Sequence, residues 1–123
     1  MDHDHTTTDK IIGCAIEVHR GLGAGLLESA YHTALCFELA HRGVRFERER
    51  PVPLMYRGMK VGDYRPDLIV EDAVVVEIKS VLRYEPVFTA QMPTYLRITG
   101  LRVGLLLNFN NTVMLNGIKR IVL

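Results

Sequence analysis

Three residues near the middle of the chain have the types and spacing that chemistry requires: Asp67, Glu77 and Lys79. Asp67 follows a proline, and Glu77 and Lys79 alternate with apolar residues in the run 74–80. A charged group inside an apolar strand is costly unless it is paired or bound to a metal ion. Two carboxylates beside a lysine are the groups that a divalent-metal site for phosphodiester chemistry needs.

Residues 64–70 and 74–80 are predicted to form a β-hairpin, because two strand-like runs flank the short segment 71–73. With that segment as the loop, Asp67 lies directly opposite Glu77, and opposed side chains have Cβ atoms about 5 Å apart. Alternation places Lys79 on the same face as the two acids. The other face is entirely apolar and is predicted to face the core; it consists of Leu68, Val70, Val74, Val76 and Ile78.

Two carboxylates at this distance repel each other unless one is protonated, solvent separates them or a cation bridges them. Mg²⁺ suits the pair, because it binds through one or two carboxylates and keeps several waters; Mn²⁺ is the expected substitute. The carbonyl of Ile78 could add a ligand, and Lys79 could orient or deprotonate the attacking water or stabilise charge on the phosphate. The alternative is a surface salt bridge on a solvated sheet face, with Lys79 pairing both acids.

Composition indicates one ordinary globular domain. The chain has 123 residues, 48% of them hydrophobic and 24% charged, and we expect a domain over residues 9–123 after a disordered segment 1–8. No apolar run approaches the roughly 20 residues of a membrane helix, so we expect no membrane association. Cys14 and Cys36 are predicted to be free buried thiols, which fits a cytoplasmic protein.

The net charge of +1 gives no overall argument for nucleic-acid binding, so such binding would need a local patch. One basic excess stands out, and it could line a phosphate track or protect an exposed sheet edge. It consists of Arg45, Arg48, Arg50, Arg57, Lys60 and Arg65.

The spacing of apolar residues predicts helices over residues 9–20, 26–42 and 87–98. Pro93 should kink the third helix or mark its true start. Strands are predicted over 44–54, 64–70, 74–80, 101–109, 113–115 and 118–123, with 59–61 as a short link between turns. Because a helix separates the hairpin from 101–109, that strand should run parallel to a hairpin strand. The expected fold class is α/β (α+β), with a mixed sheet flanked by helices.

Four residues on the predicted helices could approach this site or serve the core instead. Glu28 shares a helix face with an apolar stripe, or it is a first-turn acid that favours the helix dipole. Gln91 and Tyr95 lie four apart on the third helix, where Gln91 could bind phosphate and Tyr95 could pack in the core. His19 is expected to be a hydrogen-bonded core histidine.

Asp67, Glu77 and Lys79 resemble the PD-(D/E)XK nuclease signature. A second, more specific match is Gly25-Leu26-Leu27-Glu28-Ser29-Ala30-Tyr31, which fits the pattern that names the GxxExxY family of that superfamily. Further similarity covers Glu17-Val18-His19-Arg20, Tyr64-Arg65-Pro66-Asp67-Leu68, Gln91 with Thr94-Tyr95-Leu96, and Gly104-Leu105-Leu106-Leu107-Asn108-Phe109-Asn110. The resemblance spans residues 9–123, and Pro93 departs from it.

The resemblance implies a restriction-endonuclease-like core, αβββαβ, with an extra N-terminal helix. It also implies Mg²⁺-dependent hydrolysis of phosphodiester bonds in DNA or RNA. The resemblance also implies that Glu28 joins the metal site. With the residues argued above, the candidate catalytic residues are Asp67, Glu77, Lys79, Glu28 and Gln91, and the candidate metal ligands are Asp67, Glu77, Ile78 and Glu28. The competing hypothesis is a catalytically inactive binding module of the same fold, acting as a homodimer or with a partner chain.

Overall fold

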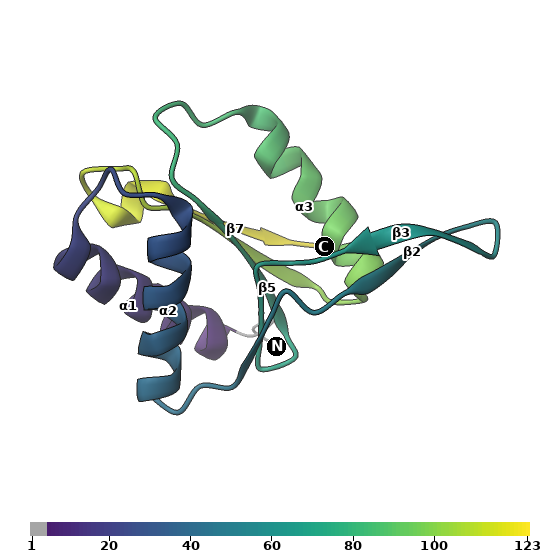
Figure 1. The fold of residues 1–123 in the computed structure, drawn as a ribbon, viewed down its shortest axis with the longest axis horizontal. Coiled ribbons are helices and arrows are strands. Elements are labelled where there is room, and N and C mark those ends of the chain that lie inside the picture. The colour runs from purple at the N-terminus through teal and green to yellow at the C-terminus, as the bar shows by residue number, and fades with distance from the viewer. Residues whose placement is uncertain (1–4) are drawn as a thin grey trace.

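The computed structural model describes residues 5–123. Its helices are α1 (His5–Leu22), α2 (Glu28–His41), α3 (Pro86–Thr99) and the short 3-10 helix η1 (Met114–Gly117). Its strands are β1 (Phe46–Arg48), β2 (Val52–Tyr56), β3 (Met59–Tyr64), β4 (Leu68–Val70), β5 (Val74–Lys79), β6 (Val103–Asn108) and β7 (Ile118–Val122). This mixed α+β composition confirms the predicted fold class, and Figure 1 traces the elements from end to end.

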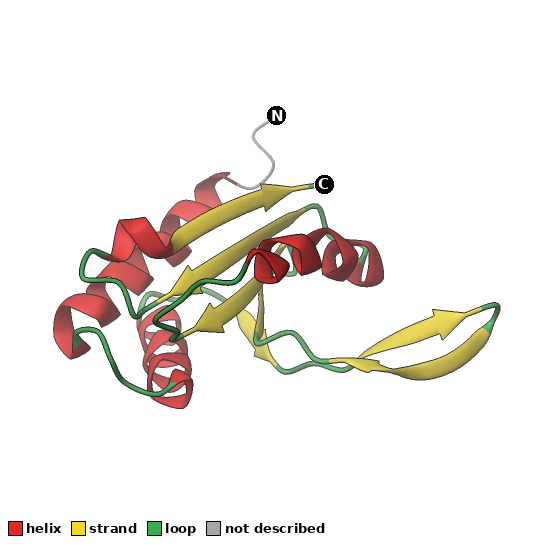
Figure 2. Ribbon diagram, turned by 90° about the horizontal axis from the view of Figure 1, so that it is seen from above, coloured by secondary structure: helices red, strands yellow, loops and turns green. Residues whose placement is uncertain are grey.

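The main sheet has five strands in the order β1-β4-β5-β6-β7. Only β5 and β6 are parallel, with Val74 beside Val103, as predicted from the intervening helix. Strand β7 confirms the strand predicted over 118–123, and it lies at one edge of the sheet, antiparallel to β6. Strands β2 and β3 pair only with each other, and Figure 2 shows that this hairpin projects away from the main sheet.

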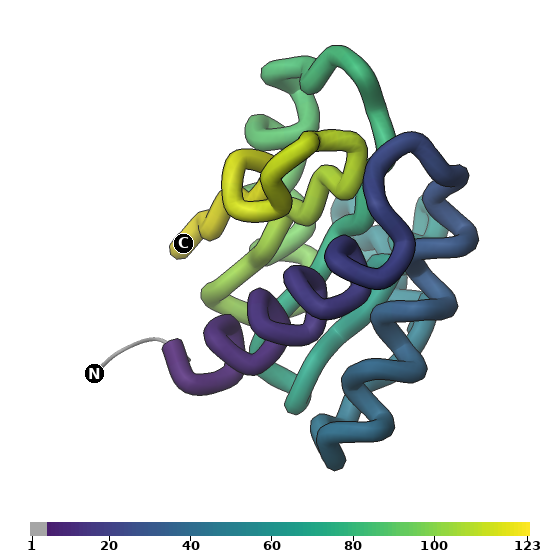
Figure 3. The backbone as a smooth tube through the Cα atoms, turned by 90° about the vertical axis from the view of Figure 1, so that its left-hand side faces the viewer, coloured from purple at the N-terminus to yellow at the C-terminus, as the bar shows by residue number. Residues whose placement is uncertain are grey.

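Helices cover both faces of the main sheet. Helices α1 and α2 lie side by side over one face, as Figure 3 shows, and bury residues three or four apart such as Ile11, Ala15 and Val18. Helix α3 covers the other face, where Met92 rests directly on Gly104, and a Cβ at that glycine would collide with the sulfur. The sheet centre is therefore buried on both sides.

The β4–β5 hairpin has the predicted loop and register. Leu68 pairs with Val76 and Val70 with Val74, so Asp67, the residue before β4, continues the same register towards Glu77. The predicted core face is confirmed, since Leu68, Val70, Val74, Val76 and Ile78 all belong to the cluster packed under α1 and α2. The opposite face is not solvated, as the alternative interpretation required, because α3 packs on it.

Several predicted boundaries are wrong for local reasons. Residues 5–8, expected to be disordered, form the first turn of α1, where the buried Thr8 donates to the carbonyl of His5; residues 1–4 lie outside the described residues. The run 44–54 breaks at Glu49, whose φ is 49°, and before Pro51. The run 64–70 breaks at 65–67, and residues 59–61 belong to β3 rather than to a link.

The C-terminal half differs from expectation at two places. Residues 113–115 do not form a strand, because Met114 turns into the core within η1. Pro93 lies inside α3 and does not mark its start, which is at Pro86, where the missing N–H needs no partner. Helix α3 ends at Gly100, whose φ of 74° suits a residue without a Cβ.

Candidate functional site

Backbone amides on opposite sides of the hairpin hold the two acids. The amide of Asp67 donates to Oε2 of Glu77 at 3.2 Å, and the amide of Ile78 donates to Oδ2 of Asp67 at 2.7 Å. These reciprocal hydrogen bonds place the acids opposite each other at the open end of the β4–β5 hairpin, next to the start of the β2–β3 hairpin.

Glu77 faces the α3 side of the sheet and is held there by a tyrosine. The hydroxyl of Tyr64 donates to Oε2 of Glu77 at 2.7 Å, and its ring stacks on Tyr95 of α3 with centroids 4.2 Å apart. Burial, followed by the charge of Asp67, raises the pKa of Glu77 from 4.5 to about 7, although Tyr64 and the Asp67 amide oppose the shift. Without a cation nearby, Glu77 therefore binds a proton up to near-neutral pH.

Burial also raises the pKa of Asp67. The hydrogen bond from Ile78 and the charge of Lys79 work in the opposite direction. Both acids of the pair thus favour the protonated form more than free carboxyls do. A bound cation would offset the free-energy cost of two desolvated carboxylates, as protonation does here.

Lys79 does not form the salt bridge that the alternative interpretation required. Its Nζ lies 4.5 Å from the centroid of the Phe88 ring on α3, and within residues 5–123 no ion pair shorter than 4.0 Å joins it to Asp67 or Glu77. The lysine still acts on both acids through space and lowers the pKa of each. The alternative of a solvated, lysine-paired surface is therefore wrong for this site.

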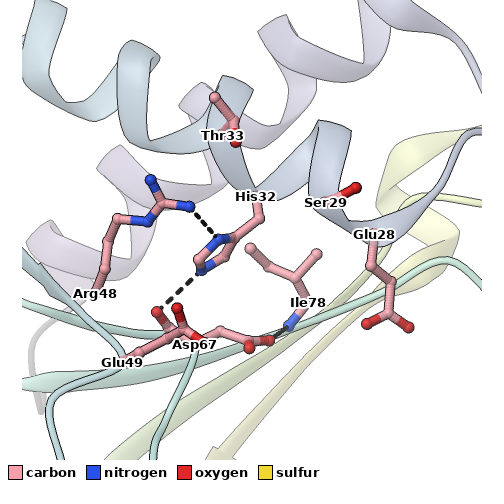
Figure 4. Close-up of a pocket in the computed structure, with 8 residues that line it drawn as sticks. All are labelled: Glu28, Ser29, His32, Thr33, Arg48, Glu49, Asp67 and Ile78. Carbon is pink, nitrogen blue, oxygen red and sulfur yellow. Dashed lines mark hydrogen bonds between the residues drawn. The ribbon is translucent and has the colours of Figure 1, made fainter.

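Asp67 also lines a cavity of about 320 Å³ on the α2 side of the sheet. Figure 4 shows its lining residues: Glu28, Ser29, His32, Thr33, Arg48, Glu49, Asp67 and Ile78. Glu28 is the first residue of α2, and it is exposed and overhangs this cavity. The hydroxyl of Ser80 donates to the carbonyl of Leu26 and so fixes the start of α2 beside the end of β5.

A histidine–arginine pair in this cavity was not predicted. His32 Nε2 lies 3.1 Å from the carbonyl oxygen of Asp67, and Arg48 Nη2 lies 2.8 Å from His32 Nδ1 (Figure 4). Because a carbonyl only accepts, Nε2 carries the proton and Nδ1 accepts from the guanidinium. His32 is four residues after Glu28 on α2, so the helical repeat was the signal that could have identified it.

The remaining predicted residues are divided between this site and the core. Gln91 is three residues after Phe88 and four before Tyr95, which places it on the α3 face that meets Lys79 and Tyr64. Tyr95 packs on that side as part of the smaller core cluster. His19 is hydrogen-bonded elsewhere, with Nε2 2.7 Å from the carbonyl of Asn111.

The donor set suits a hard divalent ion held by few protein ligands. Within residues 5–123 no three His, Cys, Asp or Glu side chains are grouped closely enough to hold a metal ion. The adjacent acids Asp67 and Glu77 offer only oxygen ligands, and both have a raised pKa in the metal-free protein. Mg²⁺ accepts such a site because it takes one or two carboxylates and retains water.

In a comparison with protein families, residues 5–121 match the model described as the PD-(D/E)XK nuclease superfamily. Neither the curated proteins nor the solved structures contain a significant match. No helix within residues 5–123 is long and apolar enough to cross a membrane.

Proposed function

The chain belongs to the PD-(D/E)XK nuclease superfamily, and from this premise we propose that it hydrolyses phosphodiester bonds in DNA or RNA with the help of Mg²⁺. The observation that carries the proposal is the pair of backbone hydrogen bonds that sets Asp67 and Glu77 opposite each other, as two half-buried acids whose pKa values are both raised. Such a pair is unfavourable for a purely structural role and suits a cation site.

In this proposal Asp67 and Glu77 would hold the ion together with the carbonyl of Ile78. The structure does not group the exposed Glu28 with the two acids, so its carboxylate would join them only after a movement of its side chain or of the start of α2. The bound ion would supply Lewis-acid activation of the attacking water and of the phosphate. Tyr64 is a positioning residue, because its hydroxyl and its stack on Tyr95 keep the Glu77 carboxylate in one place.

The other polar groups bind the substrate. Lys79 stabilises the negative charge that grows on the phosphate while the water oxygen forms one P–O bond and the ester P–O bond breaks. Gln91 donates to a phosphate oxygen from the α3 side, and Arg48, held by His32, binds a neighbouring phosphate from the α2 side. The proton released by the water ends on the leaving oxygen.

We also assign the chain to the GxxExxY branch of the superfamily, and each residue of that pattern has a physical role here. Gly25 has a φ of 93°, which residues with a Cβ rarely adopt. The hydroxyl of Tyr31 donates to the carbonyl of Gly23 at 2.5 Å and accepts from the amide of Leu26 at 3.1 Å. These contacts order the loop that delivers Glu28 to the cavity.

Two further parts of the proposal concern the setting in which the protein acts. Cys14 and Cys36 are both free and buried, which supports a reducing compartment, and we propose the cytoplasm. Burial raises the pKa of both thiols and makes them poor nucleophiles, so we give them no catalytic role. A homodimer stays a prediction.

The deciding experiment is a cleavage panel on the full chain, with single-stranded, duplex and branched DNA and RNA, in Mg²⁺, in Mn²⁺ and in EDTA. We expect cutting only with metal, and a loss of about 10³-fold or more in Glu77→Ala and Glu77→Gln, as is usual when a central electrostatic group is removed. Glu47→Gln, an exposed acid on β1, is the matched control and should cut normally. No cleavage of any substrate, with no Mg²⁺ or Mn²⁺ binding by calorimetry, would refute the proposal and favour the inactive binding module.

A further inference from the structure

The β2–β3 hairpin is a regular structure that stands apart from the rest of the fold. We call it the arm, residues 52–64, and Figures 1 and 2 show that it extends away from the main sheet. Its two-residue turn, Arg57-Gly58, has φ values of 50° and 81°, the conformation that joins tightly paired antiparallel strands. Tyr56 pairs with Met59 next to the turn, so the arm is paired up to its tip.

The outer half of the arm has no core of its own. Four apolar side chains there are more than half exposed: Met55 (58%), Tyr56 (64%), Met59 (70%) and Val61 (64%). None of them belongs to either hydrophobic cluster of the described residues. An isolated two-stranded ribbon is marginally stable in water, and contiguous exposed apolar residues usually mark a site of interaction.

Charge identifies the kind of partner. The segment 50–65 carries four cations (Arg50, Arg57, Lys60, Arg65) and one acid (Asp63), a net +3, whereas the whole chain has a net charge of +1. The rest of the chain is therefore −2. Lys60 is paired with Asp63, and Arg50 with Glu47 and Asp72, so the net positive charge of the arm and its root lies mainly on Arg57 and Arg65. A second copy would bring the same positive charge against this one, whereas a polyanion complements it.

The root of the arm is part of the proposed active site. Tyr64, the last residue of β3, donates to Glu77, and Asp67 follows three residues later. The ring of Tyr64 also stacks on Tyr95, which ties the arm to α3. A phosphate chain that crosses the Asp67–Glu77 pair would thus continue along the arm.

From exposure, charge and continuity with the site, we infer that the arm binds the nucleic acid on one side of the scissile phosphate. Arg57, Lys60 and Arg65 contact backbone phosphates, and the exposed Tyr56, beside Met59 on the same face, contacts bases. The inference rests on the proposed function, since it assigns the substrate contact of that same site.

The test measures binding separately from cleavage. Fluorescein-labelled single-stranded and duplex DNA of the same sequence are titrated with the full chain in EDTA, and affinity is followed by anisotropy at several salt concentrations. The charge-reversal variant is Arg57→Glu with Lys60→Glu. Its matched control is Lys10→Glu with Arg102→Glu, two exposed cations on α1 and before β6, at the end of the sheet remote from Glu77.

We expect the arm variant to bind about tenfold more weakly at low salt, with a salt slope reduced by about 2, because two phosphate contacts are lost. The control should bind like the wild type. If the arm binds single-stranded DNA, Tyr56→Ala should weaken that binding by about fivefold or more, because a base loses the aromatic ring on which it stacks. An equal loss on the duplex would assign the contact to a groove instead.

Unchanged affinity and salt slope in the arm variant would overturn the inference, provided thermal unfolding matches the wild type. A second result would also overturn it. If deletion of residues 55–61 converts a dimer into a monomer and leaves DNA binding unchanged, the arm is a protein interface. Cleavage separates the two proposals. If the wild type binds DNA through the arm but never cuts it, only the proposed nuclease activity is refuted. If the arm variant cuts as well as the wild type, only the role of the arm in binding is refuted.

Discussion

The two hairpins of this chain follow each other directly, and their environments are opposite. In β4–β5 the paired residues 68–70 and 74–76 are at most 1% exposed, because helices cover both faces. In β2–β3 the tip residues 55–61 are all exposed, and none of them belongs to a hydrophobic cluster of residues 5–123. The same kind of supersecondary unit therefore acts once as the centre of the core and once as an appendage.

The difference explains where the chemistry lies. A doubly covered hairpin can keep polar groups only where its pairing ends, and there each one needs a partner. Asp67 and Glu77 occupy that end and bond to each other's side of the hairpin. Tyr64, arriving from the exposed hairpin, supplies the remaining donor to Glu77. The site is thus built at the junction between a rigid hairpin and a solvated one.

The largest effect should come from removing core volume in the buried hairpin. Leu68 is fully buried under α1 and α2, so Leu68→Ala should reduce the free energy of unfolding by about 3–5 kcal/mol, through lost burial and a residual cavity. Urea unfolding followed by circular dichroism measures this loss. A loss below about 1 kcal/mol would mean that β4 is not held as described.

The next effect concerns pH and the metal-free site. The pKa of Glu77 is raised from 4.5 to about 7, so between these values the folded protein binds more protons than the unfolded chain. Stability should therefore fall as pH rises through this window, by about 3 kcal/mol from this group. Urea unfolding in EDTA at pH 4.5 and pH 8 tests the fall for wild type and Glu77→Gln.

In Glu77→Gln the amide does not titrate, so this part of the fall should disappear. Added Mg²⁺ should restore stability to the wild type at pH 8, because an ion that binds only the folded form raises its stability. Parallel pH curves for the two proteins would contradict the raised pKa.

The register of the buried hairpin could be predicted from the sequence, and with it the opposition of Asp67 and Glu77. A three-residue loop and alternating apolar residues fix that pairing, since a slip by one residue would turn the core face to solvent. The covering of the Glu77 face could not be predicted, because it depends on where α3 packs. Val75 carried the available signal, as an apolar residue on the same face as Glu77.

The separation of the arm from the main sheet could not be predicted from the sequence for a similar reason. Strand propensity describes a residue's fit to a pleated, half-buried surface and does not identify the sheet that a strand will join. The runs 44–54 and 64–70 read as continuous strands, and only Pro51, Pro53 and Pro66 mark where pairing with the main sheet lapses. The contact between His32 and Arg48 joins α2 to β1, a long-range pairing that no spacing along the chain encodes.

A smaller effect compares a tyrosine at the junction with one on the arm. Tyr64→Phe keeps the ring on Tyr95 and deletes the donor to Glu77, so the pKa of Glu77 should rise further. A hydrogen bond to a charged group contributes about 1.5–3 kcal/mol, so the ionised protein above pH 8 should lose about that amount. The control is Tyr56→Phe, whose hydroxyl is on the exposed arm, and it should unfold like the wild type at every pH. If the two variants unfold alike at every pH, the hydroxyl of Tyr64 does not stabilise the ionised form of Glu77.

The smallest effect is the one that tests the arm's independence from the fold. Met59 is 70% exposed and touches neither core cluster, so Met59→Ser removes apolar surface that is already in contact with water. Its free energy of unfolding should therefore stay within about 0.5 kcal/mol of the wild type, as for most exposed substitutions. A loss above 1 kcal/mol would show that the tip packs on the domain in solution, and the contrast between the two hairpins would then fail. An unchanged stability together with weaker DNA binding would mean that this apolar side chain serves a partner and not the fold.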